Sequence, residues 1–266
     1  MVAKPFKLDH DTPRVREEDP SIFYPCSDDE PMAEDDRQRR VMIDVSESLI
    51  RHYADRPDVY VSADIFVYYE MDNPRRKVAP DVLVSFGVKD RERLSYFTWR
   101  EGKPPDFVLE ISSPNSWRRD ATVKRDIYAA IGVNEYWRFD NNRGQVARRV
   151  LVAERLNAAG EYEPITISTM DGALTAYSAV LGLDFFAQDG ALRMYDPVSE
   201  TWLRNFQEEI AARQIAEDRA EFAEDRAQIA EDRAHIAEDR AQIAEDRAAL
   251  LERMLREHGI TPPDDD

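Results

Sequence analysis

The sequence predicts an α/β fold with a mixed β-sheet, followed by a long C-terminal helix built from seven-residue repeats. Short segments rich in β-branched and aromatic residues flank one helical segment and lead into hairpin turns, a pattern typical of a mixed sheet. An amphipathic helix precedes the first of these strands. From residue 215 onward, one heptad recurs through five consecutive units.

The α/β domain is expected to begin with a helix over residues 32–54, where Val41, Val45, Leu49 and Tyr53 recur at four-residue steps. The later segments are rich in residues that favour strands. Gly132 is suited to end the central helix in a left-handed conformation. The remaining elements are strands over 59–69, 82–86, 107–111, 135–139 and 146–152, a helix over 117–131, and weaker strands over 161–168 and 191–195.

The C-terminal repeat consists of the units IAEDRAE, FAEDRAQ, IAEDRAH, IAEDRAQ and IAEDRAA. Its alanines step by alternating four and three residues, and the Ile or Phe of each unit flanks this seam. A strict seven-residue period predicts a left-handed supercoil, so we expect a coiled coil and a homo-oligomer formed through residues 215–250. The alternative is a solvated single helix of low complexity.

Composition excludes several classes of protein. Cys26 is the only cysteine, so an internal disulfide cannot form and a thiolate metal site is not expected. The chain has no run of 18 apolar residues, and its N-terminal segment is too polar for a signal peptide. We therefore expect a cytoplasmic protein without a membrane segment.

The formal net charge of −18 is carried mainly by the two ends of the chain. Residues 37–207 hold 25 acidic and 24 basic side chains, so the net charge of the central region neither excludes nor predicts a nucleic-acid partner. The expected organisation is a flexible acidic arm over 1–30, an α/β domain over 31–205, a heptad helix over 206–258 and a disordered acidic tail over 259–266.

The residues of this sequence that could bind a metal do so through oxygen atoms. The sequence has no Walker loop, GxGxxG or GxSxG motif, and its four histidines show no ligand spacing. Asp81 opens a strand after Pro80, and Glu110 lies inside the strand FVLEI, where a buried carboxylate requires a cation or a donor. Acids on neighbouring strands suit Mg²⁺. The alternative is that Glu110 is solvated at a sheet edge.

The helix after Glu110 offers a cation. Asp120, Lys124 and Tyr128 are four residues apart and form one stripe, and Ile127 and Ile131 on the same side suggest that this stripe faces the sheet. A lysine there would point toward the strand ends and could orient an attacking water. The alternative is an Asp–Lys pair on the helix surface.

The segments RPDVYVSADIFVYY, APDVLVSFG, PDFVLEISSPNSWRRDATVKRDIYAAIGVNEYW and LGLDFF resemble, in order, the Uma-two family of bacterial proteins. The resemblance covers about residues 27–205. It implies a PD-(D/E)xK restriction-endonuclease-like core: a mixed sheet with flanking helices.

The resemblance also implies roles for individual residues. Asp81 would be the aspartate of the Pro-Asp motif and Glu110 the acid of the (D/E)xK strand. That motif usually places its lysine two residues after the acid, but Ser112 stands there, and Lys124 fits the role instead. Supporting positions would be Asp120 and Tyr128, with Glu34 as a weaker candidate and Asp64 as an inward acid without an assigned role.

These observations lead to one main hypothesis and two alternatives. The chain is expected to be a Mg²⁺- or Mn²⁺-dependent endonuclease that hydrolyses DNA, with Asp81 and Glu110 holding the metal and Lys124 acting on the attacking water. The first alternative is a catalytically inactive nuclease-fold module that binds and assembles through its coiled tail. The second is an oligomeric structural element alone.

Overall fold

The computed structural model describes residues 18–26, 36–113, 116–142, 145 and 149–257. The chain divides into two compact units, residues 1–207 and 208–266, which are described separately below.

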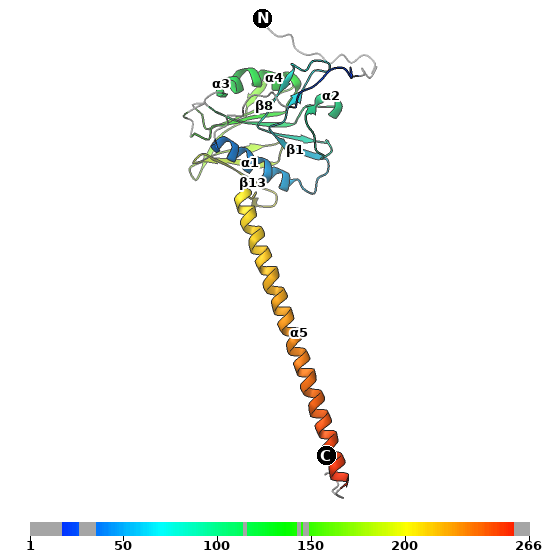
Figure 1. The fold of residues 1–266 in the computed structure, drawn as a ribbon. Helices are drawn as coiled ribbons and strands as arrows, with labels where there is room; N and C mark the ends of the chain where they lie inside the picture. Colours follow the sequence, from blue (N-terminus) through cyan, green and yellow to red (C-terminus); the bar gives the residue numbers. More distant parts are fainter. Residues whose placement is uncertain (1–17, 27–35, 114–115, 143–144, 146–148, 258–266) are drawn as a thin grey trace. The chain divides into compact units, whose positions relative to one another are not determined.

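The first unit is built on a six-stranded mixed sheet with the strand order β1-β4-β6-β7-β8-β9 (Figure 1). Neighbouring strands are antiparallel except for β6 and β7, which are parallel and are connected through the central helical segment. The strands are β1 (Val59–Ala63), β4 (Val82–Phe86), β6 (Phe107–Ile111), β7 (Glu135–Phe139), β8 (Leu151–Leu156) and β9 (Tyr162–Pro164).

Two smaller sheets complete the strands of this unit. A five-stranded antiparallel sheet runs in chain order, and a three-stranded sheet has the order β3-β2-β5. The strands of the larger sheet are β10 (Ser168–Met170), β11 (Ala173–Ser178), β12 (Leu183–Gln188), β13 (Ala191–Asp196) and β14 (Thr201–Trp202). Those of the smaller one are β2 (Val67–Tyr68), β3 (Lys77–Val78) and β5 (Tyr96–Phe97).

The helices lie on both sides of the main sheet (Figure 1). One side carries α1 (Asp36–His52), which begins with an acidic first turn that suits the positive end of its dipole. The other side carries α3 (Trp117–Arg119), the π-helical segment η1 (Asp120–Lys124) and α4 (Arg125–Ile131). Gly132 ends α4 with a φ of 91°, a left-handed conformation that favours glycine. A short helix α2 (Thr98–Glu101) follows β5.

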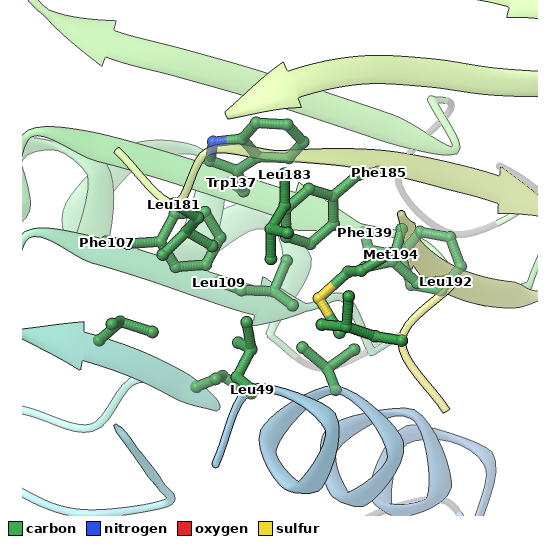
Figure 2. Close-up of a cluster of buried hydrophobic side chains, with 14 of the residues drawn as sticks. Leu49, Phe107, Leu109, Trp137, Phe139, Leu181, Leu183, Phe185, Leu192 and Met194 are labelled. Atoms are coloured by element: carbon green, nitrogen blue, oxygen red, sulfur yellow. The ribbon is translucent and has the colours of Figure 1, made fainter. Parts of the chain in front are cut away.

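Side-chain alternation along β6 separates two buried layers. Phe107, Leu109 and Ile111 point into a core between the main sheet, α1 and the five-stranded sheet. Figure 2 shows this core, in which Leu49 of α1 faces side chains from the sheets. Val108 points the other way and packs with Tyr128 of α4 in a second core. The period of two therefore places Glu110 on the α4 side of the sheet.

A buried carboxylate ties the five-stranded sheet to the main sheet. Glu135 of β7 is fully buried and accepts hydrogen bonds from Trp137 Nε1 at 3.1 Å and from Ser178 Oγ at 2.6 Å. Arg155 Nη2 lies 2.8 Å from its Oε1 atom, and the backbone N–H groups of Ala179 and Val180 donate to the same oxygen. Because every lone pair has a donor nearby, this acid serves the packing of the two sheets.

The structure corrects several sequence-based predictions. The predicted strand over 59–69 is two short strands, because the chain bends at Asp64, where φ is 48°. The strand predicted over 146–152 begins only at Leu151, and residues 146–148 lie outside the described residues. Strands β11 and β12 were not predicted, because no element was assigned between the weak strand signals on either side of them.

The prediction of a flexible arm over residues 1–30 is wrong for residues 18–26. Tyr24 packs edge-on against Tyr68 and Phe97, with ring centroids 5.0 and 5.2 Å apart. Tyr68 donates a hydrogen bond to the carbonyl of Pro25, and Arg100 pairs with Glu18 at 2.7 Å. Aromatic packing therefore fixes this stretch to the domain. The rest of the predicted arm and the tail over 259–266 lie outside the described residues.

The second unit consists of helix α5 (Phe206–Glu257), a single α-helix without a buried residue. Its Ala, Glu and Arg residues are strong helix formers. Gln214, Gln228 and Gln242 each donate to the aspartate four residues later. In the part of the chain that the structure describes, every helix is too short or too polar to cross a bilayer.

Replacing Phe185 with alanine should lower the free energy of unfolding by about 3–5 kcal/mol. Its ring packs between Phe107 and Trp137, with centroid distances of 5.8 and 4.6 Å, so truncation leaves a cavity in the first core. Tyr177→Ala removes an exposed ring from the neighbouring strand and should cost about 0.5 kcal/mol or less. Denaturant unfolding followed by tryptophan fluorescence measures this unit alone, since all four tryptophans precede α5. Equal losses in both variants would contradict the assigned core.

Candidate active site

Two acids face each other across adjacent strands of the main sheet. The β4–β6 register pairs Val82 with Leu109, and continued by one residue it places Asp81 opposite Glu110. Asp81 stands just before β4, and its Oδ2 atom accepts a hydrogen bond from the backbone N–H of Ile111 at 2.5 Å. This contact holds the Asp81 carboxylate beside the strand that carries Glu110.

Glu110 is buried to 1% exposure in the middle of β6. Lys124 Nζ lies 2.7 Å from its Oε2 atom, and the Tyr128 hydroxyl donates to Oε1 at 2.7 Å. The prediction that this stripe of the helix faces the sheet is therefore confirmed, and Glu110 is not solvated at a sheet edge. An ammonium and a hydroxyl replace the water that the carboxylate loses on burial.

Lys124 is shared among several oxygen atoms. In addition to its bond to Glu110, its ammonium donates to the carbonyl oxygen of Ala79 at 3.0 Å and lies 3.5 Å from Asp120 Oδ1. Asp120 is itself buried, and its other oxygen accepts from the Ser116 hydroxyl at 2.8 Å. A single cation thus serves two buried carboxylates.

The helix that supplies these groups is not a regular α-helix. Residues Asp120–Lys124 form a π-helical segment between α3 and α4. The Tyr136 hydroxyl donates to the backbone carbonyl of Asp120 at 2.8 Å, which ties this segment to β7. Single π-turns within helices are frequent at functional sites because they re-aim side chains.

The charges of the cluster are not balanced within it. Burial raises the pKa of Glu110, Lys124 opposes the rise, and the charges of Asp81 and Asp120 add to it, so that the pKa reaches about 8. Burial lowers the pKa of Lys124, but the three surrounding carboxylates outweigh it and the pKa is raised. Burial and the nearby Glu110 charge raise the pKa of the Tyr128 phenol, so it acts as a neutral hydrogen-bond donor. The cluster therefore attracts further positive charge.

A pocket of about 210 Å³ opens next to this cluster. Its wall includes Arg138, which is paired with Glu110 in the β6–β7 register, and Ser112, two residues after Glu110. Arg138 Nη2 is neutralised by Glu154 at 2.7 Å, whereas Arg149 is exposed. The remaining lining residues are Trp117, Ala121 and Val152. An aromatic ring and two guanidinium groups thus border this pocket, whose lining does not include Asp81, Glu110 or Lys124.

The other predicted site residues divide into two groups. Ser112 is buried, and its backbone N–H donates to Phe139 at 2.8 Å, so it lines the pocket without contacting the cluster through any described hydrogen bond. Asp64 was predicted to be an inward acid within a strand, and this is wrong: it is exposed, because the bend after β1 turns its side chain away from the sheet alternation. Glu34 lies outside the described residues.

The sequence reasoning missed Arg138, Arg149 and the carbonyl of Ala79. The alternation in EYWRF would have placed Arg138 on the face of Tyr136. For Ala79 and Arg149, both in irregular chain between strands, the sequence carries no comparable signal.

The donors of the cluster fit a hard divalent cation that keeps part of its water shell. Among the described residues, no group of three His, Cys, Asp or Glu side chains forms a complete ligand set. Mg²⁺ commonly uses only one or two carboxylates together with waters and phosphate oxygens. Each carboxylate oxygen has two lone pairs, so Glu110 retains acceptor capacity after its bonds to Lys124 and Tyr128. The buried Asp120 Oδ1 has no hydrogen-bond partner, although Lys124 lies within ion-pair distance.

A mixed sheet with helices on both faces and acids on two adjacent strands is the arrangement of a restriction-endonuclease-like protein. Residues 24–187 match the family model Uma2, which is described as "Putative restriction endonuclease". Because this match spans more than half of the chain, the protein belongs to the Uma2 family, which confirms the resemblance noted in the sequence.

A crystal structure of a putative nuclease of the DUF820 group, from Anabaena variabilis ATCC 29413, is 13% identical to this chain with a TM-score of 0.39. The alignment covers 53% of this chain and 74% of that chain. The comparison with curated proteins gives no match.

Replacing Lys124 with methionine should lower the free energy of unfolding by about 3 kcal/mol or more, because Glu110 then loses the cation that compensates its burial. The double variant Lys124→Met/Glu110→Gln should recover most of this loss. Lys103→Met is the control, since Lys103 also pairs with a carboxylate, Asp106, at 2.6 Å but is 34% exposed and should cost about 1 kcal/mol or less. Thermal unfolding of the wild type and the three variants measures these losses, and a double variant no more stable than Lys124→Met would argue against the coupling.

Proposed function

We propose that this protein is a divalent-metal-dependent endonuclease that hydrolyses phosphodiester bonds in DNA. The observation that carries the proposal is the 2.7 Å contact between Lys124 and the buried Glu110, with Asp81 opposite Glu110 on the neighbouring strand. Membership in the Uma2 family supports a nuclease activity. The carboxylate oxygens of the cluster support a hard cation as its metal.

In this proposal Asp81 and Glu110 hold the metal. A bound Mg²⁺ or Mn²⁺ ion would polarise the scissile phosphate and lower the pKa of its bound water. The Ile111 N–H keeps the Asp81 carboxylate aimed along the strand, and the Tyr128 hydroxyl fixes the orientation of Glu110. Lys124, held by the Ala79 carbonyl and by Glu110, places an ammonium where it can orient an attacking water and offset charge that develops on the phosphate.

The charges of the residues that line the pocket support a nucleic-acid substrate. Residues 37–207 are nearly neutral overall, so binding to a polyanion must depend on local cations. Arg149 at the mouth of the pocket is exposed, and Arg118 lies over the Trp117 ring at 4.8 Å. In the proposal these guanidinium groups contact the phosphate backbone on either side of the bond that is cut.

Asp81→Asn, Glu110→Gln and Lys124→Met should each reduce metal-dependent cleavage of plasmid DNA by about a hundredfold or more. The first two replacements keep the shape of the side chain, so the domain should remain folded. Asp64→Asn is the matched control, because Asp64 is an acid near the same strand ends but is turned to solvent, and it should cleave like the wild type. Nicking assays with Mg²⁺, Mn²⁺ and excess EDTA measure the effect. Comparable nicking by the wild type and the three site variants would exclude the proposal.

Arg149→Ala should weaken binding to duplex DNA by roughly tenfold and reduce the slope of log K against log salt by about one. The cause would be the loss of one phosphate contact beside the acid cluster. Arg40→Ala is the control, because Arg40 is also exposed but lies on α1, on the opposite side of the main sheet. Fluorescence anisotropy with Ca²⁺ in place of Mg²⁺ measures binding without turnover. Equal effects of the two variants would remove Arg149 from the interface.

A second candidate function is a nuclease-fold module that binds and assembles without cleavage. The observation in its favour is that both oxygens of Glu110 already accept hydrogen bonds and that the described residues contain no three-acid ligand set. Calorimetric titration with Mn²⁺ separates the candidates. The enzyme must bind Mn²⁺ through Asp81 and Glu110, so Asp81→Asn and Glu110→Gln should abolish this binding, whereas the assembly module need not bind the metal. Homo-oligomerisation through residues 215–250 is compatible with either candidate.

A further inference from the structure

Helix α5 carries a surface that takes no part in the candidate active site. None of its residues is buried. One large apolar side chain per repeat is more than half exposed, and these residues are Ile215, Phe222, Ile229, Ile236 and Ile243. Their seven-residue spacing is the period of a coiled coil, and the seam that they flank consists of the alanines of the repeat.

Only one assignment of heptad positions gives apolar residues at both core positions, a and d. If Ile215 is placed at a, Asp218 falls at d, and if it is placed at d, Arg219 falls at a. Placing Ala220 at a and Ala216 at d makes every a and d residue of the five repeats an alanine, and it puts the exposed Ile or Phe of each repeat at c, outside the core. The same frame continues beyond the repeats and places Leu251 at d and Leu255 at a.

This frame also places opposite charges on the two sides of the alanine seam. The g positions are Arg219, Arg226, Arg233, Arg240 and Arg247, and the e positions are Glu217, Glu224, Glu231, Glu238, Glu245 and Glu252.

The arginines have no acidic partner within their own helix. The residues three and four positions from Arg226 are Phe222, Ala223, Ile229 and Ala230, and in the other repeats these positions hold Ile, Phe, Ala or Leu. In the described helix, no ion pair engages these five arginines, whereas Arg213 and Arg253, outside the repeats, pair with the glutamate four residues later. Within the described helix, these five guanidinium groups beside the seam therefore have no ion-pair partner.

We propose that α5 binds a second copy of this chain in a parallel, in-register coiled coil with the alanines at its core. In a parallel pair, each g residue faces the e residue five positions later on the other helix. Arg219 would then meet Glu224 of the second copy, and the next repeats continue the series to Arg247 and Glu252. In an antiparallel pair, g faces g and e faces e, which sets arginine against arginine and glutamate against glutamate.

The choice of a second copy as the partner rests on this charge complementarity. The small alanines let two helices approach closely but bury little area, so the e–g pairs and the two C-terminal leucines must contribute much of the selectivity. Both helices present the same pattern, and one copy satisfies the arginines and glutamates of the other in every repeat. This inference is independent of the proposed chemistry.

Cysteine crosslinking of the full-length chain tests the orientation. Cys26→Ser removes the native thiol, and Ala220→Cys or Ala248→Cys then adds one thiol near either end of the seam. Each variant alone should form a disulfide-linked dimer under mild oxidation. Crosslinking only in a mixture of the two variants would show an antiparallel pair, and no crosslinking in any sample would show that the helices do not associate. Either result overturns the proposal.

Charge reversal with a matched control tests the pairing. Replacing Glu224, Glu231, Glu238, Glu245 and Glu252 with arginine should weaken self-association by roughly a hundredfold or more, because arginines then face arginines. The control replaces Asp218, Asp225, Asp232, Asp239 and Asp246 with arginine, which changes the charge equally at position f, on the outer side of the helix.

Sedimentation equilibrium should find the first variant at the monomer mass of 30.8 kDa, and the wild type and the control at twice that mass. Circular dichroism confirms that the helix is retained in all three proteins. A monomeric wild type, a dimeric first variant or equal dissociation of both variants would each refute the pairing.

Discussion

The arrangement of the α/β domain depends on how one carboxylate is compensated after burial. Glu110 occupies the middle of β6 with 1% exposure, so its oxygens must find donors inside the protein. Among the described residues the charged donor to Glu110 is Lys124, and its bond forms only when the helix lies across the sheet with that face turned inward. The same contact therefore fixes the position of the helix and assembles the candidate site.

A second buried carboxylate on the neighbouring strand shows what a purely structural acid looks like in this protein. Glu135 accepts hydrogen bonds from an indole, a hydroxyl, a guanidinium and two backbone N–H groups. From the residues that the structure describes, Glu110 accepts two hydrogen bonds, and beside it one oxygen of Asp120 has no hydrogen-bond donor. The two acids lie on opposite faces of one sheet, and only the cluster around Glu110 retains capacity for a further ligand.

The sequence could predict those parts of the site in which a regular repeat sets the direction of the side chains. The period of two along β6 and the four-residue spacing of Asp120, Lys124 and Tyr128 predicted the meeting of strand and helix, because both patterns report the direction of side chains. The bend at Asp64 and the π-turn before α4 depend on tertiary contacts that leave no periodic trace.

The same limit applies to the fold. Five-residue strands in which three residues are β-branched or aromatic were predicted at their observed bounds, as for β4 and β6. The five-stranded sheet was largely missed, because its strands contain alanine, serine and aspartate, which favour strands weakly, and gain their stability from packing against the main sheet. The docking of Tyr24 against Tyr68 likewise depends on residues distant in sequence, so composition alone suggested an arm.

Helix α5 lies outside the stretch that matches the family model, so its repeats add a property to a nuclease-like domain. In a parallel pair, both domains are attached to the same end of the coil, because each helix begins directly after its own domain. The two candidate sites would then share a high effective concentration on one substrate. Duplex DNA offers two strands of opposite polarity, and a molecule with two sites can address both without dissociating. Under the two proposals, which are argued from separate residues, the coiled coil would bring two acid clusters to one duplex.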